Sequence, residues 1–295
     1  MALMRNQTLS RIFILGATGR VGQRLMARLS EGGYPLEGPP PDDPDILSFE
    51  SVRARLRDYA PTLVINCAAL TNVDYCAEHP EEAYRVNALG VQNIALVCAE
   101  IGATLCHIST NEVFDGLKGS PYWESDPTHP INPYGYSKWA AEAMIRDALP
   151  RHMIVRTSWL FAHDGVNFLH KIKAAALAGK PLSVVTDEIA CPTYNEDFVE
   201  ALVKLVQTER CGTYHLVNEG YASRYDFARC ILDTYGMRDY PITPISLAQF
   251  KRPSTPPPFG VLRNLIGAHL GIVLRHWREA VEAFVEREKR EDPHV

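Results

Sequence analysis

The sequence predicts an α/β fold, with a doubly wound parallel sheet followed by a smaller C-terminal domain. In the first half of the chain, short apolar runs alternate with amphipathic segments, which is the pattern of repeated strand, helix, strand units. The length of 295 residues allows one large domain or two moderate ones. Beyond Arg156, turn-rich segments interrupt the helices. We therefore expect a first domain at residues 1–158 and a smaller one at 159–295.

The first strand and the first helix are expected at Ile12–Leu15 and Val21–Leu29. The strand is a short run of apolar residues, whereas apolar residues in the helix recur at helical spacing. The helix should end at Gly32 and Gly33, because glycine favours the C-terminal end of a helix. The proline-rich piece that follows, Pro35–Pro44, is interpreted as a surface loop.

The alternation continues through the middle of the first half. A polar helix at Ser51–Tyr59 precedes the second expected strand, Leu63–Ala69, and Pro61 separates the two. The helix at Asn87–Ile101 has apolar residues at steps of three and four and ends before a glycine. The short apolar segment Thr104–Ile108 is then the next strand, as a parallel sheet built from repeated units requires.

The last unit of the first domain is a helix and a strand. The helix over Tyr134–Leu149 opens at an Asn-Pro pair, and proline is tolerated in the first turn of a helix. Met153–Val155 is the strand after it. In the second half Gly212–Asn218 also has the composition of a strand, so part of residues 184–218 is expected to return to the first sheet.

Composition and charge exclude several classes of protein. Hydrophobic residues make up 46% of the chain and charged residues 22%, as in folded globular proteins. A formal charge of -5 without a dense basic run argues against a nucleic-acid partner. Seven scattered cysteines without a Cys-x-x-Cys pair predict buried thiols and no metal site. Met1–Ser10 lacks a signal peptide and no apolar run reaches about 20 residues, so we expect a cytoplasmic protein without membrane contact.

A glycine motif lies between the first strand and the first helix. Its glycines, Gly16, Gly19 and Gly22, are spaced as Gly-x-x-Gly-x-x-Gly and permit a tight turn with close approach of the backbone to a ligand. The helix that follows adds partial positive charge at its N-terminus. An ordinary glycine-rich turn has about equal weight on the motif alone. The strand before it and the helix after it favour a pyrophosphate site.

Tyr134 and Lys138 lie four residues apart, on one face of the expected helix. Tyrosine titrates near pH 10, and a neighbouring ammonium is expected to lower the pKa of Tyr134 and to bring it closer to proton transfer at neutral pH. Thr110 stands at the C-terminal end of a strand, where open parallel sheets bind ligands. A surface Tyr-Lys pair and a capping threonine are the plain alternatives. The glycine loop, Thr110 and the Tyr-Lys pair occurring together favour the chemical interpretation.

These motifs resemble those of the extended short-chain dehydrogenase/reductases, and more closely those of the dTDP-4-dehydrorhamnose reductase family. The resemblance covers almost the whole chain and is weakest from about residue 251. The matching segments are GATGRVG at 16–22, DIL at 45–47, INCAALTNVDYCAEHPEEAYRVNALG at 65–90, HISTNEVFDG at 107–116, NPYGYSKWAAE at 132–142, RTSWLF at 156–161, GVNFLHKI at 165–172, VVTDEIACPTYNEDFVEAL at 184–202 and GTYHLVNEGYASRYDFA at 212–228.

The resemblance implies a Rossmann-type domain, a smaller substrate-binding domain and reduction of the 4-keto group of a nucleotide-linked 6-deoxy sugar by NADP or NAD. It implies catalytic roles for Thr110, Tyr134 and Lys138, with Tyr134 as the proton donor to C4. A homodimer is a further expectation of the family. Residues implied to bind the cofactor are Gly16, Thr18, Gly19, Arg20, Val21, Gly22, Asp45, Ile46, Ala68, Ala69, Asn87, Tyr134 and Lys138. Residues implied to bind the substrate are Asn111, Glu112, Trp159 and Asn167.

Two residues depart from the family pattern at the sugar. The family commonly reads Ser-Thr-Asp-Tyr where this chain has Asn111 and Glu112 after Thr110. The related sugar-nucleotide dehydratases use a Glu at this place as a base, so a dehydratase or epimerase that uses Glu112 is an alternative. Asn111 cannot deliver a proton as the Asp of those enzymes does. A second alternative is a non-catalytic cofactor-binding subunit, since the methionine adenosyltransferase beta subunit also resembles this family.

A further departure concerns the choice of cofactor. Many dinucleotide sites bind the ribose hydroxyls of NAD with an acid at the end of the second strand. The segment Tyr34–Pro39 offers no clear acid for this purpose, and Arg20 is available for a 2'-phosphate. We therefore expect NADP rather than NAD.

Overall fold

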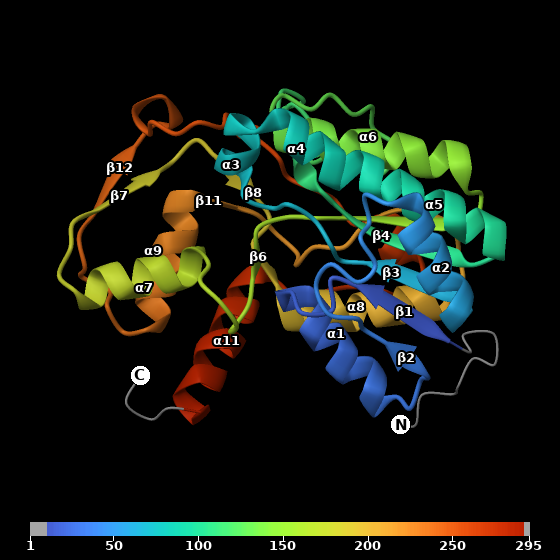
Figure 1. Cartoon of the computed structure of the whole chain (residues 1–295). Coiled ribbons are helices and arrows are strands. Elements are labelled where there is room, and N and C mark those ends of the chain that lie inside the picture. The colour runs from blue at the N-terminus through green and yellow to red at the C-terminus, as the bar shows by residue number, and fades with distance from the viewer. Residues whose placement is uncertain (1–10, 292–295) are drawn as a thin grey trace.

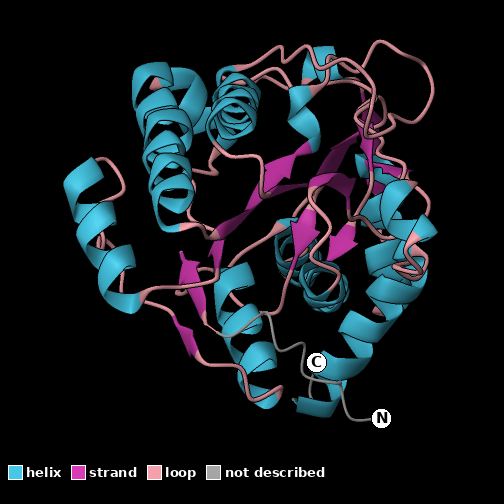
Figure 2. Cartoon of the chain, turned by 90° about the vertical axis from the view of Figure 1, so that its right-hand side faces the viewer, coloured by secondary structure: helices cyan, strands magenta, loops and turns pink. Residues whose placement is uncertain are grey.

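In the computed structural model, which describes residues 11–291, the larger domain is built on a six-stranded parallel sheet of order β10-β5-β4-β3-β1-β2 (Figure 1). Helices cover both faces of this sheet, as Figure 2 shows. The central strands are buried along their length because helices pack on both sides of them. The strands are β1 (Ile12–Leu15), β2 (Leu36–Glu37), β3 (Leu63–Asn66), β4 (Thr104–Thr110), β5 (His152–Thr157) and β10 (Gly212–His215).

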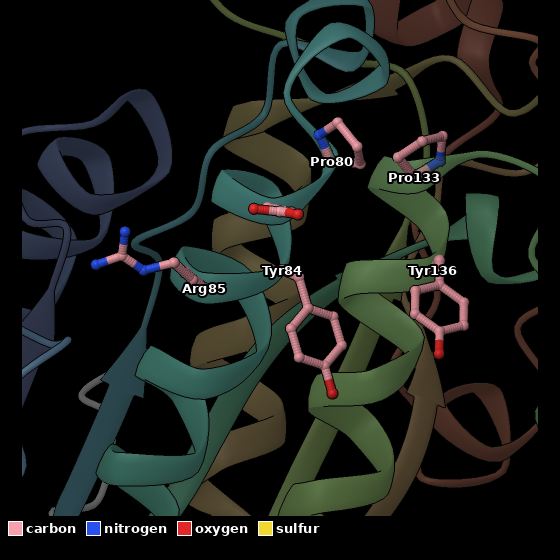
Figure 3. A pocket seen from close by; sticks show the side chains of 6 residues that line it. Pro80, Tyr84, Arg85, Pro133 and Tyr136 are labelled. Carbon is pink, nitrogen blue, oxygen red and sulfur yellow. The ribbon is translucent and has the colours of Figure 1, made fainter.

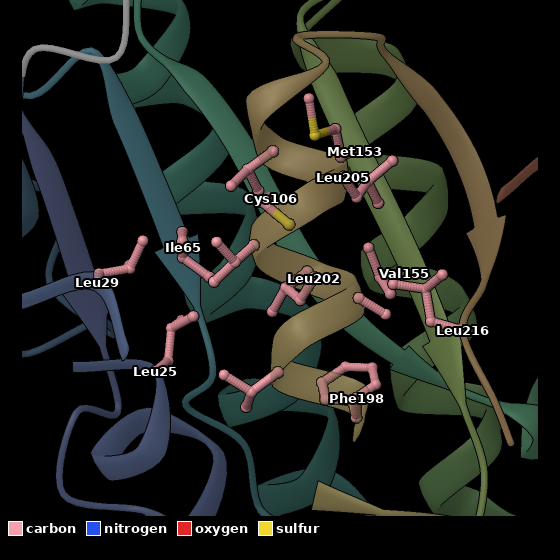
Figure 4. Close-up of a cluster of buried hydrophobic side chains, with 14 of the residues drawn as sticks. Leu25, Leu29, Ile65, Cys106, Met153, Val155, Phe198, Leu202, Leu205 and Leu216 are labelled. Atoms are coloured by element: carbon pink, nitrogen blue, oxygen red, sulfur yellow. The ribbon is translucent and has the colours of Figure 1, made fainter. Parts of the chain in front are cut away.

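Two helical layers enclose the sheet. Side chains of α1 (Arg20–Glu31) and α8 (Asn195–Gln207) pack on one face, where Leu25 and Leu202 meet Ile65 of β3 (Figure 4). The other face is covered by α2, α5 and α6. The remaining helices of this domain are α2 (Phe49–Tyr59), α3 (Val73–Glu78), α4 (Pro80–Tyr84), a π-helical turn (Arg85–Leu89), α5 (Gly90–Ile101), the short 3-10 helix Asn111–Val113 and α6 (Pro133–Ala148).

The smaller domain has its own core around α7, α9 and α11. Phe161 lies at its aromatic centre. The ring centroids of Phe227 and Phe284 lie 5.6 and 5.7 Å from that of Phe161. The helices are α7 (Phe168–Leu177), α9 (Arg224–Thr234), the 3-10 helix Leu247–Gln249 and α11 (Trp277–Glu291). The short helix α10 (Ile266–His269) packs instead beside β10 of the larger sheet. The strands, in two-residue or four-residue pieces, are β6 (Leu160–Phe161), β7 (Leu182–Val185), β8 (Ile189–Ala190), β9 (Thr193–Tyr194), β11 (Ala222–Ser223) and β12 (Ile242–Ile245).

The strands and helices expected in the first half are confirmed, with one exception. Residues Leu36–Glu37, which the sequence placed in a surface loop, pair in parallel with β1 as the edge strand β2. Prolines before and after them shorten the strand and hide it from a pattern search. Leu63–Asn66 is therefore the third strand in chain order. The expected return of the 212–218 segment is also confirmed, because β10 pairs with β5.

All seven cysteines are free thiols. Five are buried and Cys67 is partly buried, whereas Cys211 is exposed, so the expectation of buried thiols is wrong for that residue. Between residues 11 and 291 no helix combines the length and the apolar character that a bilayer crossing needs. The expectation for Met1–Ser10 lies outside the described residues.

A buried ion pair fixes α6 to the sheet. Glu142 of α6 accepts hydrogen bonds from Nε and Nη2 of Arg156 on β5, at 2.9 and 2.7 Å. The hydroxyl of Ser109 on β4 donates to the same carboxylate at 2.6 Å. Burial opposes ionisation of Glu142, but the hydrogen bonds and charge of Arg156, with Ser109 and Arg146, together outweigh it and hold the pKa below its usual range. β4, β5 and α6 are thereby joined at the Glu142 carboxylate, which is fully buried.

Replacing Glu142→Gln should lower the free energy of unfolding by about 3–5 kcal/mol, because Arg156 would be left as an unpaired buried charge. The matched control is Glu100→Gln, which removes a carboxylate that pairs with Arg53 and Arg57 at the surface. That control should change the free energy of unfolding far less, because water and salt screen an ion pair at the surface. Urea unfolding followed by circular dichroism measures both, and equal losses would contradict the assignment.

Candidate functional site

A cleft of about 560 Å³ lies at the carboxyl edge of the sheet. Its walls come from the glycine loop, the ends of β3, β4 and β5, the start of α6 and the smaller domain. The predicted site residues that line it are Gly19, Arg20, Val21, Gly22, Ala69, Thr110, Asn111, Glu112, Tyr134, Lys138, Trp159 and Asn167. The predicted residues that do not line it are Gly16, Thr18, Asp45, Ile46, Ala68 and Asn87.

The glycine loop is shaped so that side chains would not fit. Gly16 has a φ of +73°, and a Cβ there would lie 2.6 Å from the backbone nitrogen of Ala68. A Cβ on Gly22 would lie 2.1 Å from the carbonyl oxygen of Gly16. The backbone N–H of Gly19 donates to that same oxygen at 3.0 Å and closes the turn. The start of α1 is thus packed closely against the strands, with its N-terminus at the cleft.

Unpartnered polar atoms also line the cleft. Within residues 11–291 the side-chain oxygens of Thr157, Ser158 and Asn195 are buried without a hydrogen-bond partner. All three residues line the cleft. Buried polar atoms are normally paired, so these oxygens fit a ligand that supplies hydrogen bonds. Together with the glycine loop they fit a dinucleotide. Sequence reasoning did not find them, although Thr157 and Ser158 lie in the matching RTSWLF segment, because a missing partner is visible only in three dimensions.

The other residues predicted to meet a cofactor have local partners. Asp45 is exposed and its carboxylate accepts from the Leu47 N–H at 3.0 Å. Ile46 packs on Gly90, where a Cβ would approach the Ile46 side chain to 2.9 Å. Asn87 is fully buried and joins the loop after β3 to α6, through Leu70 and the Ser137 hydroxyl. Their contact with a cofactor stays a prediction.

The sequence reasoning overlooked an acid at the end of the second strand. Glu37 is the last residue of β2, which is the position that the sequence left without an acid. Its carboxylate forms an ion pair with Arg55 of α2. Arg20 lies elsewhere, beside the loop before α7, with its Nε 3.7 Å from the place of a Cβ on Gly165. An acid therefore does stand at the end of the second strand, but the Glu37 carboxylate is already paired with Arg55.

Thr110, Tyr134 and Lys138 form one wall of the cleft. The Thr110 hydroxyl donates to Asn111 Oδ1 at 3.4 Å and accepts from the Glu112 N–H at 3.2 Å. It lies close enough to Tyr134 to lower the pKa of that phenol in part. Asn132 caps α6, since its Oδ1 accepts from the Gly135 N–H at 2.8 Å. The strand end and the helix start therefore place Thr110 and Tyr134 in the same cleft.

The electrostatics of this wall differ from the expectation. Burial and the Glu112 carboxylate raise the pKa of Tyr134, and Lys138 does not reverse this. Burial lowers the pKa of Lys138 to about 8. The expected lowering of the Tyr134 pKa is therefore wrong for the free protein, because desolvation outweighs a cation that is itself destabilised. Tyr134 stays a protonated phenol, which is the form that donates a proton.

Glu112 faces the cleft as a carboxyl group with perturbed acidity. Burial raises its pKa to about 7, although Asn132 Nδ2 donates to Glu112 Oε2 at 2.6 Å and favours the charged form. Its neighbour Asn111 is buried beneath Gly260, where a Cβ would come within 2.4 Å of Asn111 Nδ2. Of the two residues that depart from the family pattern, Glu112 is the one with a titratable group in the cleft.

The smaller domain contributes Trp159, Asn167 and Arg224 to the cleft. Trp159 has a φ of +39°, a strained conformation for a non-glycine residue. The guanidinium of Arg224 lies 3.5 Å from the centre of its ring and pairs with Glu188 at 2.8 Å. Asn167 caps α7, with Oδ1 accepting from the His170 N–H and Nδ2 donating to a carbonyl. Its predicted substrate contact is untested.

A second hollow of about 550 Å³ lies on the outside of α4 and α6. Figure 3 shows Tyr84 and Tyr136 on these two helices, with ring centroids 6.1 Å apart. Tyr134 and Lys138 do not line it. This hollow is therefore separate from the wall formed by Thr110, Tyr134 and Lys138.

Comparison with known proteins identifies the family. The family model described as the RmlD substrate binding domain matches residues 10–290. The chain belongs to this family. This confirms the resemblance deduced from the sequence.

Relatives of the RmlD family cover nearly the whole chain. The spore coat polysaccharide biosynthesis protein SpsK of Bacillus subtilis is 35% identical over 94% of this chain and 98% of its own. A dTDP-4-dehydrorhamnose reductase of Mycolicibacterium smegmatis is 36% identical over 92% and 84%. The solved structure of the Bacillus anthracis dTDP-4-dehydrorhamnose reductase in complex with NADP is 32% identical, with a TM-score of 0.90 over 94% and 99% of the two chains.

Gly16→Ala should weaken binding of a dinucleotide about tenfold or more, because the new methyl group would push the glycine loop away from Ala68. Gly102→Ala is the matched control. Gly102 has the same φ of +73° with nothing within 4 Å of its Cβ position, so it tests the backbone strain without the clash. Fluorescence titration with NADPH measures both, and equal affinities would contradict the role of the loop.

Proposed function

We propose that the protein is an NADPH-dependent reductase of a nucleotide-linked 4-keto-6-deoxy sugar, of the dTDP-4-dehydrorhamnose reductase type, in which Tyr134 donates the proton to C4. The observation that carries the proposal is the wall formed by Thr110, Tyr134 and Lys138 in the cleft beside the glycine loop. Membership of the RmlD family and reductases among its relatives support the same chemistry.

Thr110, Tyr134 and Lys138 each have a separate role in the proposed reduction of the ketone. The nicotinamide cofactor supplies the hydride. The Thr110 hydroxyl and the Tyr134 phenol hold the keto oxygen, where two donors stabilise the negative charge that develops on it. Tyr134 then transfers its proton to that oxygen, for which its raised pKa keeps it loaded at neutral pH. Lys138 donates hydrogen bonds to cofactor hydroxyls from the adjoining turn of α6.

NADP fits the end of the edge strand β2 better than NAD does. A free carboxylate at the end of β2 would bind the ribose hydroxyls of NAD and repel a 2'-phosphate. Glu37 is held instead by Arg55, which also lies 3.7 Å from Asp43. The Bacillus anthracis relative was solved with NADP. The substrate side is supplied by Trp159 and Arg224, a ring and a cation suited to a sugar carrying a diphosphate.

A dehydratase or epimerase that uses Glu112 is the second candidate. The pKa of Glu112, raised to about 7, suits a general base near neutral pH. Such an enzyme would put solvent deuterium into the sugar without net consumption of NADPH. A stoichiometric loss of NADPH absorbance without deuterium incorporation would support the reductase.

Tyr134→Phe should lower kcat with a dTDP-4-keto-6-deoxy sugar by about 10²–10⁴-fold, because the proton donor is removed. The control is Tyr136→Phe, on the exposed face of the same helix, which should keep the parent rate. Loss of NADPH absorbance in stopped flow measures both variants. A Tyr134→Phe enzyme as fast as the parent would exclude the proposed donor.

The Michaelis constant for the sugar nucleotide should rise as the pH falls below about 7, because protonation of Glu112 removes a charged acceptor for sugar hydroxyls. Glu112→Gln should raise the constant by about tenfold above pH 7, where the parent carboxylate is charged, bring it close to the parent value at pH 6, and so remove this pH dependence without changing cofactor affinity. Steady-state kinetics from pH 6 to 9 test this. A pH dependence that persists in the variant belongs to another group and would exclude Glu112 as its source.

A further inference from the structure

The side chain of Asn132 connects three segments that are distant in the sequence. Its Oδ1 accepts from the Gly135 N–H at 2.8 Å and caps α6. Its Nδ2 donates to Glu112 Oε2 at 2.6 Å and to the carbonyl oxygen of Thr255 at 3.0 Å. Asn132 is 5% exposed and does not line the cleft, so it acts on a ligand there only through its neighbours.

Thr255 belongs to residues 252–258, a segment outside the helices and strands that we call the strap. The start of the strap is bonded to α3, where Asp74 Oδ1 accepts from Arg252 Nε at 2.8 Å. Its last residue is bonded to β8, because its carbonyl oxygen accepts from the Ile189 N–H at 2.8 Å. The strap is therefore held at both ends, and its middle carbonyl stays beside the cap of α6.

The partners of Asn132 determine how its amide is oriented. The Gly135 N–H only donates and needs the amide oxygen, whereas the Thr255 carbonyl only accepts and needs the NH₂ group. Both contacts give the same orientation, in which an N–H is directed at Glu112 Oε2. Turning the amide over would lose both contacts. Glu112 Oε2 therefore meets a donor in either charge state of its carboxyl group.

The two oxygens of the Glu112 carboxyl group are for this reason not equivalent. A proton on Oε2 would point at the hydrogen of the Asn132 amide, so a protonated Glu112 carries its proton on Oε1. Within residues 11–291 Asn132 is the one hydrogen-bond partner of this carboxylate. Glu112 lines the cleft. Oε1 is then the oxygen that remains for a ligand.

We propose that Asn132 is a positioning residue for Glu112, which binds Oε2 and leaves Oε1 to accept a hydrogen bond from a hydroxyl group of the sugar. A charged carboxylate only accepts, so its partner on the substrate must donate, as a hydroxyl group does. The hydroxyl partner rests on the proposed reductase function. The orientation of Asn132 and its effect on Glu112 do not.

Other titratable and charged groups also face Glu112. Burial has the largest effect and raises its pKa to about 7, a neighbouring carboxylate raises it further, and two guanidiniums oppose the rise. A phenol and a thiol nearby have raised pKa values of their own and are uncharged at neutral pH. These groups are Glu188 before β8, Arg252 of the strap, Arg224 of α9, Tyr134 of α6 and Cys76 of α3. A change at Asn132 leaves all of them in place.

Asn132→Asp tests the contact with little change of shape, and it keeps the cap of α6 because Asp caps helices as well as Asn does. The N–H that faces Glu112 becomes a carboxylate oxygen, and two adjacent carboxylates do not both ionise near neutral pH. The shared proton goes to Glu112, because its pKa is already raised whereas the new carboxylate lies at a helix N-terminus. The titration of Glu112 should therefore move up by about one pKa unit or more, a tenfold gain in proton affinity.

Carbon-13 NMR of the full-length, ligand-free protein, labelled at the glutamate carboxyl groups, measures this titration. The Glu112 signal is assigned by its loss in Glu112→Gln. Asn72→Asp is the matched control, because Asn72 caps α3 by accepting from the Tyr75 N–H at 3.2 Å and is exposed. It should leave the Glu112 titration unchanged. A folded Asn132→Asp protein with the parent titration of Glu112 would overturn the proposal, whether or not the protein reduces sugars.

A double variant keeps the test valid if Asn132→Asp is unstable. In Asn132→Asp/Glu112→Gln the glutamine NH₂ group can donate to the new carboxylate, so donor and acceptor are exchanged. At pH 8, Glu112→Gln should therefore raise the melting temperature more in the Asn132→Asp background than in the parent. Equal changes in the two backgrounds would count against the contact. If neither variant folds, the loss does not depend on Glu112 and the proposal fails.

In active enzyme the same change should separate the Michaelis constant from kcat. The rise of the Michaelis constant on acidification should begin about one pH unit higher in Asn132→Asp than in the parent, while kcat at saturating sugar nucleotide stays near the parent value. A shifted Glu112 titration with an unchanged pH profile would overturn the assignment of Oε1 to the sugar. Absence of turnover in the parent would count against the proposed function and leave the NMR and melting results valid.

Discussion

The position of the wall formed by Thr110, Tyr134 and Lys138 depends on the buried contact between Glu142 and Arg156. Glu142 lies one turn of α6 beyond Lys138, and the Ser109 hydroxyl that donates to it is adjacent to Thr110. The same carboxylate therefore fixes the helix that carries the phenol and the amine and the strand end that carries the hydroxyl. Because a buried charge tolerates little displacement from its partners, the two halves of the wall are held in one arrangement.

Desolvation sets the charge states in the cleft. It raises the pKa of Tyr134 and of Glu112 and lowers that of Lys138, so each group is shifted toward its uncharged form. Glu142, outside the cleft, keeps a low pKa in spite of burial because Arg156, Ser109 and Arg146 favour its charged form. A phenol that keeps its proton suits reduction of a ketone, in which the protein must give a proton rather than take one.

The two domains are joined by a chain that crosses between them more than once. After β9 in the smaller domain, α8 and β10 return to the larger one. Ion pairs from Arg24 and Arg28 of α1 to α8 hold this returning segment. The smaller domain thus contributes Trp159 and Arg224 to a cleft whose other wall is the Rossmann sheet.

Patterns of neighbouring residues in the sequence determined most of the secondary structure and part of the candidate site. Buried strands, the glycine loop, the Asn-Pro start of α6 and the four-residue spacing of Tyr134 and Lys138 depend on neighbours in sequence, so the sequence predicted them. It did not predict β2, whose two residues are too few for periodicity, and so it missed Glu37 as the strand-end acid. The direction of the Tyr134 pKa, the unpartnered oxygens beside β5 and the contacts of Asn132 with Glu112 and Thr255 arise from burial and from pairs distant in the chain. Only the tertiary structure decided these, because desolvation and hydrogen-bond direction depend on what surrounds a group in space.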